Sequence, residues 1–197
     1  MKYDVYHSSK ISGLKVLEPR ISTHKKAWIY ATKDIVTSAM FLGDNFDFIC
    51  QTGIQTLPYI WERFKGAFEL AYKDKTGSIY ILDGTNFKRG MTSWSEDLVS
   101  ENKEKVKEEI RVNNVEEYLK ELANKKQLDI YYYPNQPKHS PKDKSDIVQR
   151  GVEWTIAFGE GTLEQVEKYH PDVLIRIIEQ LKTKNYVFKA NKWRSYI

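Results

Sequence analysis

Residues 28–42 read Trp-Ile-Tyr-Ala-Thr-Lys-Asp-Ile-Val-Thr-Ser-Ala-Met-Phe-Leu, and this stretch decides the fold that the sequence predicts. Its first part, Trp28 to Thr32, is rich in aromatic and β-branched side chains, which favour a strand. From Asp34 onward the pattern is helical, with Thr32 or Asp34 as a suitable N-cap and Gly43 as a suitable stop. The stretch therefore predicts a compact strand that leads directly into a short helix.

Two further segments carry polar residues beside predicted strands. At the start of the chain, Tyr3-Asp4-Val5-Tyr6 alternates as a short strand does and brings His7 to its end. Later, Glu96 comes just before the strand-like run Leu98–Ser100. The sequence thus places a histidine, a tyrosine and an acid, in that order, each next to a predicted strand.

This order resembles the His-Tyr-Glu class of ADP-ribosyltransferases, which includes the poly(ADP-ribose) polymerases and the small bacterial rifampicin-modifying transferases. The most specific part of the likeness is Tyr30 followed by Ser38, Ala39 and Phe41, because the family pattern is a tyrosine, small residues and then Ser-Ala-x-aromatic. The likeness spans residues 1 to about 115, and few of those positions carry a motif.

The resemblance implies a role for each matched residue. Tyr30 and Phe41 would cover the two faces of the nicotinamide ring of NAD, and the Ser38 hydroxyl would hold its carboxamide. Aromatic faces suit a flat ring that carries positive charge, and a buried amide needs hydrogen-bond partners. His7 would hold the ribose on the adenine side. Glu96 would bind the 2′-hydroxyl of the nicotinamide ribose and polarise the attacking group.

Two points in this assignment stay open at the level of sequence. The family usually has glycine after the strand-end histidine, and this chain has Ser8, which offers the same backbone N–H and C=O if its φ/ψ values are ordinary. Asp97 and Glu101 are alternatives to Glu96, because a shift of one residue turns a side chain to the opposite face of a strand.

Composition sets broader limits. The chain has 197 residues, of which 41% are hydrophobic and 13% aromatic, so it can bury a sizeable core in one or two small domains. A net charge of +4 favours anionic ligands only modestly and falls short of a dedicated nucleic-acid binder. The single Cys50 excludes an intramolecular disulfide, and no Cys or His spacing fits a zinc site. An apolar signal region and a membrane-spanning stretch are both missing from the sequence, which predicts a cytoplasmic protein that binds no metal and no membrane.

The rest of the chain alternates between strand and helix patterns. Strands are predicted over 46–50, 67–72, 78–82 and 105–112, with a hairpin turn at 73–77 between the second and third of them. Helices are predicted over 58–64, 115–125 after an Asn114 cap, 147–158, 163–169 after a capping box at Thr162, and 171–181. Residues 131–141 hold three of the six prolines and predict an exposed, non-helical segment.

These patterns predict an α+β fold in which residues 1–125 form an ADP-ribosyltransferase-like NAD-binding domain with a mixed or antiparallel split β-sheet. Residues 126–197 are expected to form a proline-containing loop and a helical C-terminal extension. Basic and aromatic residues interleave near the C-terminus, which makes residues 184–194 the better of the candidate nucleic-acid contacts, although a solvated face with buried aromatic anchors is the favoured explanation.

The predicted reaction is transfer of ADP-ribose from NAD, as co-substrate, to an unknown protein, nucleic-acid or small-molecule acceptor, with release of nicotinamide. NAD glycohydrolysis is an alternative that the sequence does not separate from transfer. RNA 2′-phosphotransferases use pairs of Arg and His that this chain lacks at matching positions. A non-catalytic module that binds a nucleotide, a nucleic-acid end or a protein through His7, Tyr30 and Phe41 is the alternative from another class.

Overall fold

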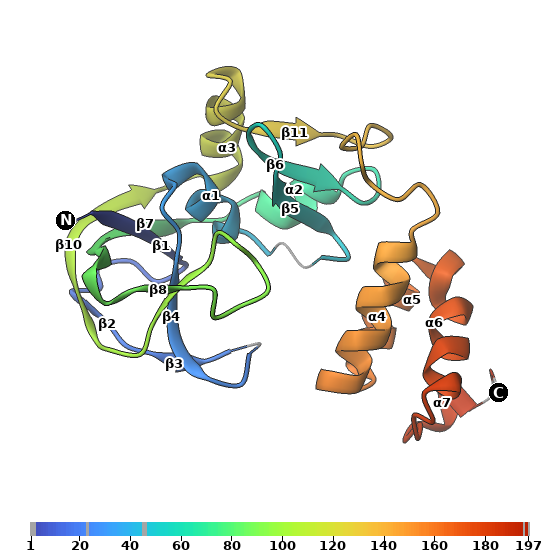
Figure 1. The fold of residues 1–197 in the computed structure, drawn as a ribbon. Helices are drawn as coiled ribbons and strands as arrows, with labels where there is room; N and C mark the ends of the chain where they lie inside the picture. Colours follow the sequence, from blue (N-terminus) through green and yellow to red (C-terminus); the bar gives the residue numbers. More distant parts are fainter. Residues whose placement is uncertain (1–2, 23, 45–46, 195, 197) are drawn as a thin grey trace. The chain divides into compact units, whose positions relative to one another are not determined.

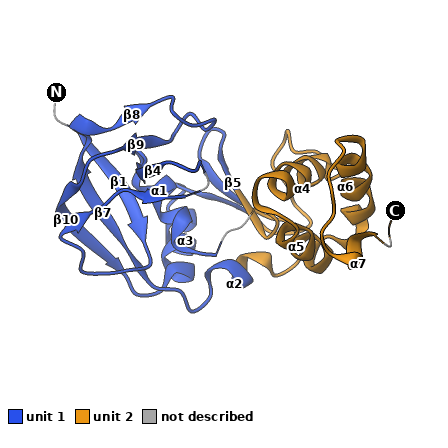
Figure 2. Cartoon of the chain, turned by 90° about the horizontal axis from the view of Figure 1, so that it is seen from below, with its two compact units in different colours: residues 1–45, 52–60, 69–130 blue, residues 46–51, 61–68, 131–197 orange. Residues whose placement is uncertain are grey.

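The computed structural model describes residues 3–22, 24–44, 47–194 and 196, and Figure 1 shows the course of the chain. Its α+β class is the one that the sequence predicts. The chain forms two compact units (Figure 2): unit 1 comprises residues 1–45, 52–60 and 69–130, and unit 2 comprises residues 46–51, 61–68 and 131–197. The chain leaves unit 1 for the last time at residue 130, five residues beyond the expected boundary, and two earlier segments group with unit 2.

Unit 1 contains two four-stranded antiparallel sheets. The first has the order β1 (Asp4–Ser9), β7 (Gly77–Asp83), β10 (Glu104–Val112) and β2 (Val16–Leu17). The second has the order β3 (Arg20–Ile21), β4 (Ala27–Ala31), β9 (Leu98–Ser100) and β8 (Lys88–Arg89). An isolated bridge joins them, because the backbone N–H groups of Tyr6 and Thr32 each donate to the other residue's carbonyl, at 2.8 and 2.9 Å.

A shared apolar core holds the two sheets together. Buried side chains from both sheets and from the segment after η2 (Gly84–Asn86) meet in it: Val5, Leu17, Ile29, Ala31, Tyr80, Leu82, Phe87 and Leu98. Removing this much apolar surface from water is the main stabilising contribution that the strands make to unit 1. The strands that carry His7 and Tyr30 are therefore fixed by packing on their inner faces.

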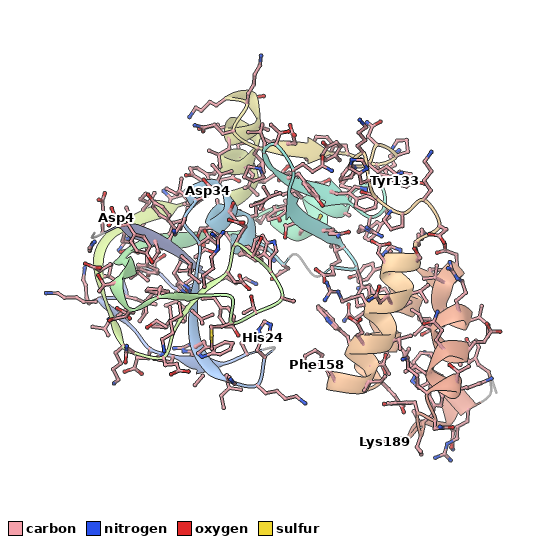
Figure 3. The ribbon with its side chains drawn as sticks, in the orientation of Figure 1. Asp4, His24, Asp34, Tyr133, Phe158 and Lys189 are labelled. Carbon is pink, nitrogen blue, oxygen red and sulfur yellow. The ribbon has the colours of Figure 1, made fainter. Side chains whose placement is uncertain are left out.

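The predicted strand-to-helix stretch is confirmed, with one refinement. The helix is α1 (Ile35–Ala39), and a 3₁₀ turn, η1 (Met40–Leu42), continues it to Gly43. Asp34, labelled in Figure 3, is the N-cap. Its carboxylate accepts from the N–H of Thr37 at 2.8 Å and from the Thr37 hydroxyl at 2.6 Å. The cap satisfies a backbone donor that a helix of this length otherwise leaves unpaired.

Three predicted elements between residues 46 and 77 are wrong. Of the strand expected over 46–50, residue 46 lies outside the described residues, 47–49 form a turn, and β5 (Cys50–Ile54) begins at the last position. The expected helix over 58–64 is the strand β6 (Pro58–Glu62), which pairs with β5 and with β11 (Asp129–Tyr131). The expected strand over 67–72 is the helix α2 (Ala67–Tyr72), so residues 73–77 join a helix to β7 and form no hairpin.

The helices that follow agree with the sequence in position. Asn114 caps α3 (Val115–Asn124), as predicted, by accepting from the N–H of Glu117 at 3.1 Å. Unit 2 contains α4 (Ser145–Phe158), α5 (Gly161–Tyr169), α6 (Pro171–Thr183) and α7 (Asn191–Arg194). The capping box expected at Thr162 is wrong, because α5 begins one residue earlier and Thr162 lies inside it.

The core of unit 2 lies among its helices. Its largest members include Phe48, Phe188 and Trp193, and α4 approaches α6 closely at Gly151, where an added Cβ would lie 2.5 Å from the Ile177 Cδ1 atom. His170, between α5 and α6, is fully buried, and its Nε2 atom lies 2.6 Å from the Phe48 carbonyl oxygen. The aromatic residues near the C-terminus that the sequence analysis singled out are in part core anchors, as Phe188 and Trp193 show.

Candidate functional site

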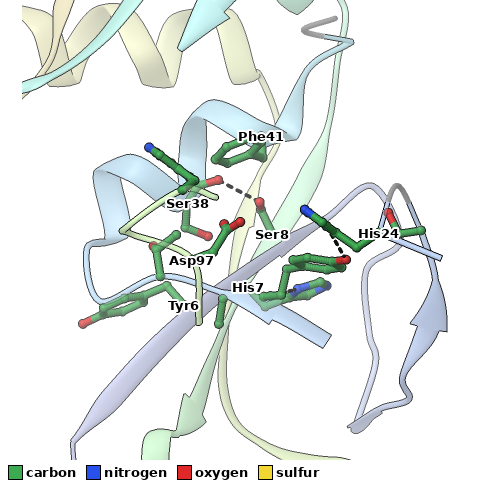
Figure 4. Close-up of a pocket in the computed structure, with 12 residues that line it drawn as sticks. Tyr6, His7, Ser8, His24, Ser38, Phe41 and Asp97 are labelled. Carbon is green, nitrogen blue, oxygen red and sulfur yellow. Dashed lines mark hydrogen bonds between the residues drawn. The ribbon is translucent and has the colours of Figure 1, made fainter. Parts of the chain in front are cut away.

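A pocket of about 350 Å³ in unit 1 is the candidate functional site (Figure 4). Its walls include five of the six residues that the sequence analysis selected: His7, Ser8, Tyr30, Ser38 and Phe41. These residues come from three elements, β1, β4 and the α1–η1 segment. Residues distant in sequence thus meet at one site, because the two sheets share a core on one side and separate on the other.

The pocket forms where β1 and β4 stop pairing. The two strands are joined by the Tyr6–Thr32 bridge, and beyond it the His7 ring spans the gap, with Nδ1 lying 2.6 Å from the Tyr30 carbonyl oxygen. A carbonyl oxygen only accepts, so Nδ1 carries the proton and Nε2 is the unprotonated nitrogen. Burial lowers the pKa of His7, and the charge of Arg20 adds to this, while the hydrogen bond to Tyr30 opposes it. The His7 ring is therefore neutral at pH 7.

Ser8 has ordinary backbone geometry for its position in β1, and it is not among the described residues with positive φ. The Tyr6 N–H and C=O point toward β4, and alternate residues of a strand direct these groups to the same edge. The N–H and C=O of Ser8 therefore point toward the side on which the pocket opens. Its hydroxyl donates to the Ser38 carbonyl at 2.7 Å and ties β1 to α1.

Ser38 sits on the buried face of α1, in the position that the Asp34 cap and the helix geometry give it. The residue is only 2% exposed, and its Oγ atom has no hydrogen-bond partner among the described residues. Most buried polar atoms are paired, and an unpaired hydroxyl costs about 1–3 kcal/mol. Because Ser38 also lines the pocket, its unpaired hydroxyl lies close to a space that a polar ligand can occupy.

Aromatic side chains form much of the remaining wall. The Tyr30 hydroxyl lies 3.0 Å from His24 Nδ1, and the Phe41 ring meets the Trp94 ring edge-on with 5.6 Å between their centroids. His24 and Trp94 both line the pocket. Neither was selected from the sequence, although an isolated tryptophan in the polar run Thr92-Ser93-Trp94-Ser95 is a signal that a sequence analysis could use.

The acid in the pocket is Asp97, and Glu96 is not among the residues that line it. Glu96 lies in the turn before β9, where its Oε1 atom is 3.3 Å from the Arg89 guanidinium and 3.1 Å from the Ser95 hydroxyl. Asp97 directly precedes β9 and accepts from the Thr92 hydroxyl at 2.8 Å. Glu101, the other alternative, accepts from the Trp28 indole N–H at 3.2 Å and does not line this pocket either. The structure therefore brings together every selected residue except the glutamate.

Burial is the largest influence on the pKa of Asp97. It raises the pKa of the Asp97 carboxyl, and the Thr92 hydroxyl and the positive charge of His24 partly oppose this shift. A carboxyl with a raised pKa in a pocket that also holds two histidines is a common feature of functional sites.

A second pocket of about 330 Å³ adjoins the first, and His7, Ser22 and Tyr30 line both. Its walls are apolar on one side, with Leu14 and Ile29 among them, and Arg20 is its one arginine. The His7 and Tyr30 side chains thus belong to the walls of two neighbouring hollows.

Among the described residues, no group of three or more His, Cys, Asp or Glu side chains is placed to hold a metal ion. In the same part of the chain, no helix is both long and apolar enough to cross a membrane. Comparisons with protein-family models, with curated proteins and with solved structures found no match. The function must therefore be argued from the pocket itself.

Proposed function

We propose that the pocket binds NAD by its nicotinamide end and that the protein transfers ADP-ribose from NAD to an acceptor, with release of nicotinamide. The observation that carries the proposal is Ser38, a residue that lines an aromatic pocket and whose buried hydroxyl has no hydrogen-bond partner among the described residues. The carboxamide of nicotinamide offers both a donor and an acceptor to such a hydroxyl, whereas an apolar ligand would leave it unpaired.

The neighbours of Ser38 suit the rest of the nicotinamide group. Tyr30 and Phe41 present aromatic rings to the pocket, and the nicotinamide ring of NAD carries the positive charge that aromatic faces attract. The N–H and C=O at the open edge of Ser8 complement a second donor and acceptor pair on the carboxamide. Ring and carboxamide are thus both recognised without a charged side chain.

The adjoining pocket suits the remainder of a dinucleotide. His7 stands at the wall between the two pockets with its unprotonated Nε2, which accepts from a ribose hydroxyl. Arg20 lines the second pocket and suits a phosphate oxygen, because a guanidinium forms strong charge-assisted hydrogen bonds. We therefore assign the nicotinamide end to the first pocket and the adenosine end to the second.

The test is to incubate the purified protein with NAD and to follow free nicotinamide by mass spectrometry. We expect Tyr30→Ala and Phe41→Ala each to lower the release by about 100-fold, since a misplaced ring loses the orientation that bond cleavage needs. Phe158→Ala is the matched control, because Phe158 at the end of α4 is 50% exposed, as against 42% for Phe41, and does not line the pocket. Phe158→Ala should release nicotinamide at the wild-type rate.

A second function, that of a nucleotide-binding module without catalysis, follows from the position of Glu96. The glutamate expected to act on the ribose is engaged with Arg89 and Ser95. If the chemistry required Glu96, the pocket would bind NAD without cleaving it. An NAD-induced rise in melting temperature with no nicotinamide release would favour this function. If the protein neither binds NAD nor releases nicotinamide, both proposed functions are wrong. Release without any acceptor would indicate hydrolysis.

A further inference from the structure

The loop between β8 and β9 is built around one threonine hydroxyl. Thr92 Oγ1 accepts from the N–H of Trp94 at 3.3 Å and donates to Asp97 Oδ2 at 2.8 Å, and the N–H of Asp97 donates to the Trp94 carbonyl at 3.2 Å. A hydroxyl has one hydrogen, so its longer contact of 3.2 Å with the Trp94 carbonyl is secondary. The loop thereby presents the Trp94 ring and the Asp97 carboxylate to the same pocket.

The position of the two adjacent acids follows from the strand that comes after them. Leu98, the first residue of β9, pairs with Ala31 and enters the core of unit 1. Asp97 precedes it at the mouth of the pocket, and Glu96 lies one residue further back, beside Arg89 of β8. Glu96 lies in the turn, where its carboxylate contacts Arg89 and Ser95, so of the two acids only Asp97 lines the pocket.

We propose that Asp97 is the carboxylate that acts on the ribose in this pocket, and that Thr92 is its positioning residue. This inference rests on the proposed function. In the reaction, the bond between ribose C1′ and the nicotinamide nitrogen breaks, and its electron pair leaves with nicotinamide. The ionised Asp97 holds the ribose 2′-hydroxyl and stabilises the positive charge on C1′. A lone pair of the acceptor forms the new bond to C1′, and the proton of the acceptor passes to Asp97 and then to solvent.

The hydrogen bond from Thr92 favours the ionised form of Asp97, because a hydroxyl donates to a carboxylate. Other titratable groups that line the pocket are His24, whose positive charge acts in the same direction, and His7, Tyr6 and Tyr30. Loss of the Thr92 hydroxyl should therefore raise the pKa of Asp97. Since the ionised form is the active one, the acidic limb of the pH–rate profile should move to higher pH.

The experiment measures nicotinamide release, kcat and KM for NAD between pH 4 and 9 in a set of variants. Asp97→Asn should lower kcat by about 100-fold or more, whereas Glu96→Gln should stay within about threefold of wild type. Thr92→Val should lower kcat by about tenfold at acidic pH and much less at alkaline pH, with KM nearly unchanged. Thr92→Ser keeps the hydroxyl and should restore the wild-type profile.

Thr85→Val is the matched control, because the Thr85 hydroxyl likewise donates to an aspartate, Asp83, in an exposed turn outside the pocket. It should leave the pH profile unchanged. Carboxyl NMR of Asp97 in wild type and Thr92→Val reads the same pKa shift without any substrate. An unshifted Asp97 signal, or a pH profile that Thr92→Val leaves in place, would overturn the role of Thr92.

The outcomes also separate this inference from the proposed function. Suppose that the wild type releases nicotinamide, and that either Asp97→Asn remains active or Glu96→Gln is inactive. The assignment of Asp97 is then wrong, and the proposed function stands. A wild type that neither binds NAD nor releases nicotinamide overturns both.

Discussion

Each of the two units buries a polar atom that has no hydrogen-bond partner among the described residues, and the surroundings of the two atoms are opposite. In unit 1 the atom is Ser38 Oγ, at the wall of a pocket that polar and aromatic groups share. In unit 2 it is Nδ1 of the fully buried His170, whose ring lies 5.9 Å from the Phe64 ring and donates through Nε2 to the Phe48 carbonyl. We propose that a ligand pairs with the first atom, whereas the burial of the His170 ring makes the stability of unit 2 depend on pH.

His7 of unit 1 and His170 of unit 2 can be compared in the same way as the two unpaired atoms. His7 and His170 each bond a backbone carbonyl at 2.6 Å, His7 through Nδ1 and His170 through Nε2. Burial lowers the pKa of both rings. His7 keeps its second nitrogen beside two pockets, whereas the second nitrogen of His170 is buried. Burial and a hydrogen bond to a backbone carbonyl are thus common to both histidines, and the surroundings of the second ring nitrogen are what differ.

The largest effect we predict is the loss of stability of unit 2 in mild acid. Burial lowers the pKa of His170 from 6.5 to about 4. Between these values the unfolded chain binds a proton that the folded unit does not, so the free energy of unfolding falls as the pH falls from 6.5 to about 4 and then levels off. The full loss is about 3 kcal/mol. Urea unfolding followed by NMR of methyl groups in α4 and α6 measures it.

Two variants isolate this effect from the carboxyl groups that titrate in the same range. His170→Leu should be less stable at pH 7, because the Phe48 carbonyl loses its donor, but its stability should no longer respond to His170 protonation. His139→Leu, in an exposed loop, should keep the wild-type pH dependence. If the free energy of unfolding depends on pH equally in wild type and His170→Leu, His170 is not the source of that dependence. The contrast between the two buried atoms is then wrong.

The next effect is on ligand binding. Ser38→Ala should weaken NAD binding by about tenfold, measured by calorimetry, because the carboxamide loses a buried hydroxyl. Its melting temperature should not fall, since the hydroxyl that it removes has no partner among the described residues. Ser100→Ala is the matched control: Ser100 is equally buried, but its hydroxyl donates to Glu104 at 2.6 Å. Ser100→Ala should lose stability and keep its affinity for NAD. If instead Ser38→Ala loses stability and keeps its affinity, while Ser100→Ala binds NAD more weakly, the proposed role of Ser38 is wrong.

The smallest effect concerns a buried hydrogen bond next to the pocket residue Phe41. The buried Tyr72 hydroxyl of α2 donates to the Met40 carbonyl at 2.9 Å, next to Phe41. Tyr72→Phe should lower the free energy of unfolding of unit 1 by about 1 kcal/mol, because a buried carbonyl loses a donor. Its effect on NAD affinity should be smaller than that of Ser38→Ala. Tyr118→Phe, on α3, should change neither quantity, and thermal unfolding with and without NAD compares the two variants.

The sequence predicted the pocket side formed by residues 28–42 well and the region between residues 46 and 77 poorly. The signal for α2 was present, since Ala67, Phe68, Ala71 and Tyr72 are all nearly or fully buried and recur at helical spacing. For β6 no clear alternation exists, because Ile60, Trp61 and Glu62 are consecutive and all buried. A charged residue can take a buried strand position here because its carboxylate accepts from the N–H groups of Phe68 and Tyr133, at 2.8 and 2.9 Å. Tyr133 is distant from Glu62 in sequence.

The sequence by itself determined the features that depend on neighbours within one or two turns of chain. They include the strand that ends at Tyr30 and Ala31, the helix that Asp34 caps, and the amphipathic helices of unit 2. Only the tertiary structure decided that Asp97 and not Glu96 lines the pocket, and that the Ser38 hydroxyl has no partner in the part of the chain that the structure describes. The physical reason is that both depend on strand register and on which distant backbone groups come within hydrogen-bond distance, and a shift of one residue reverses the outcome.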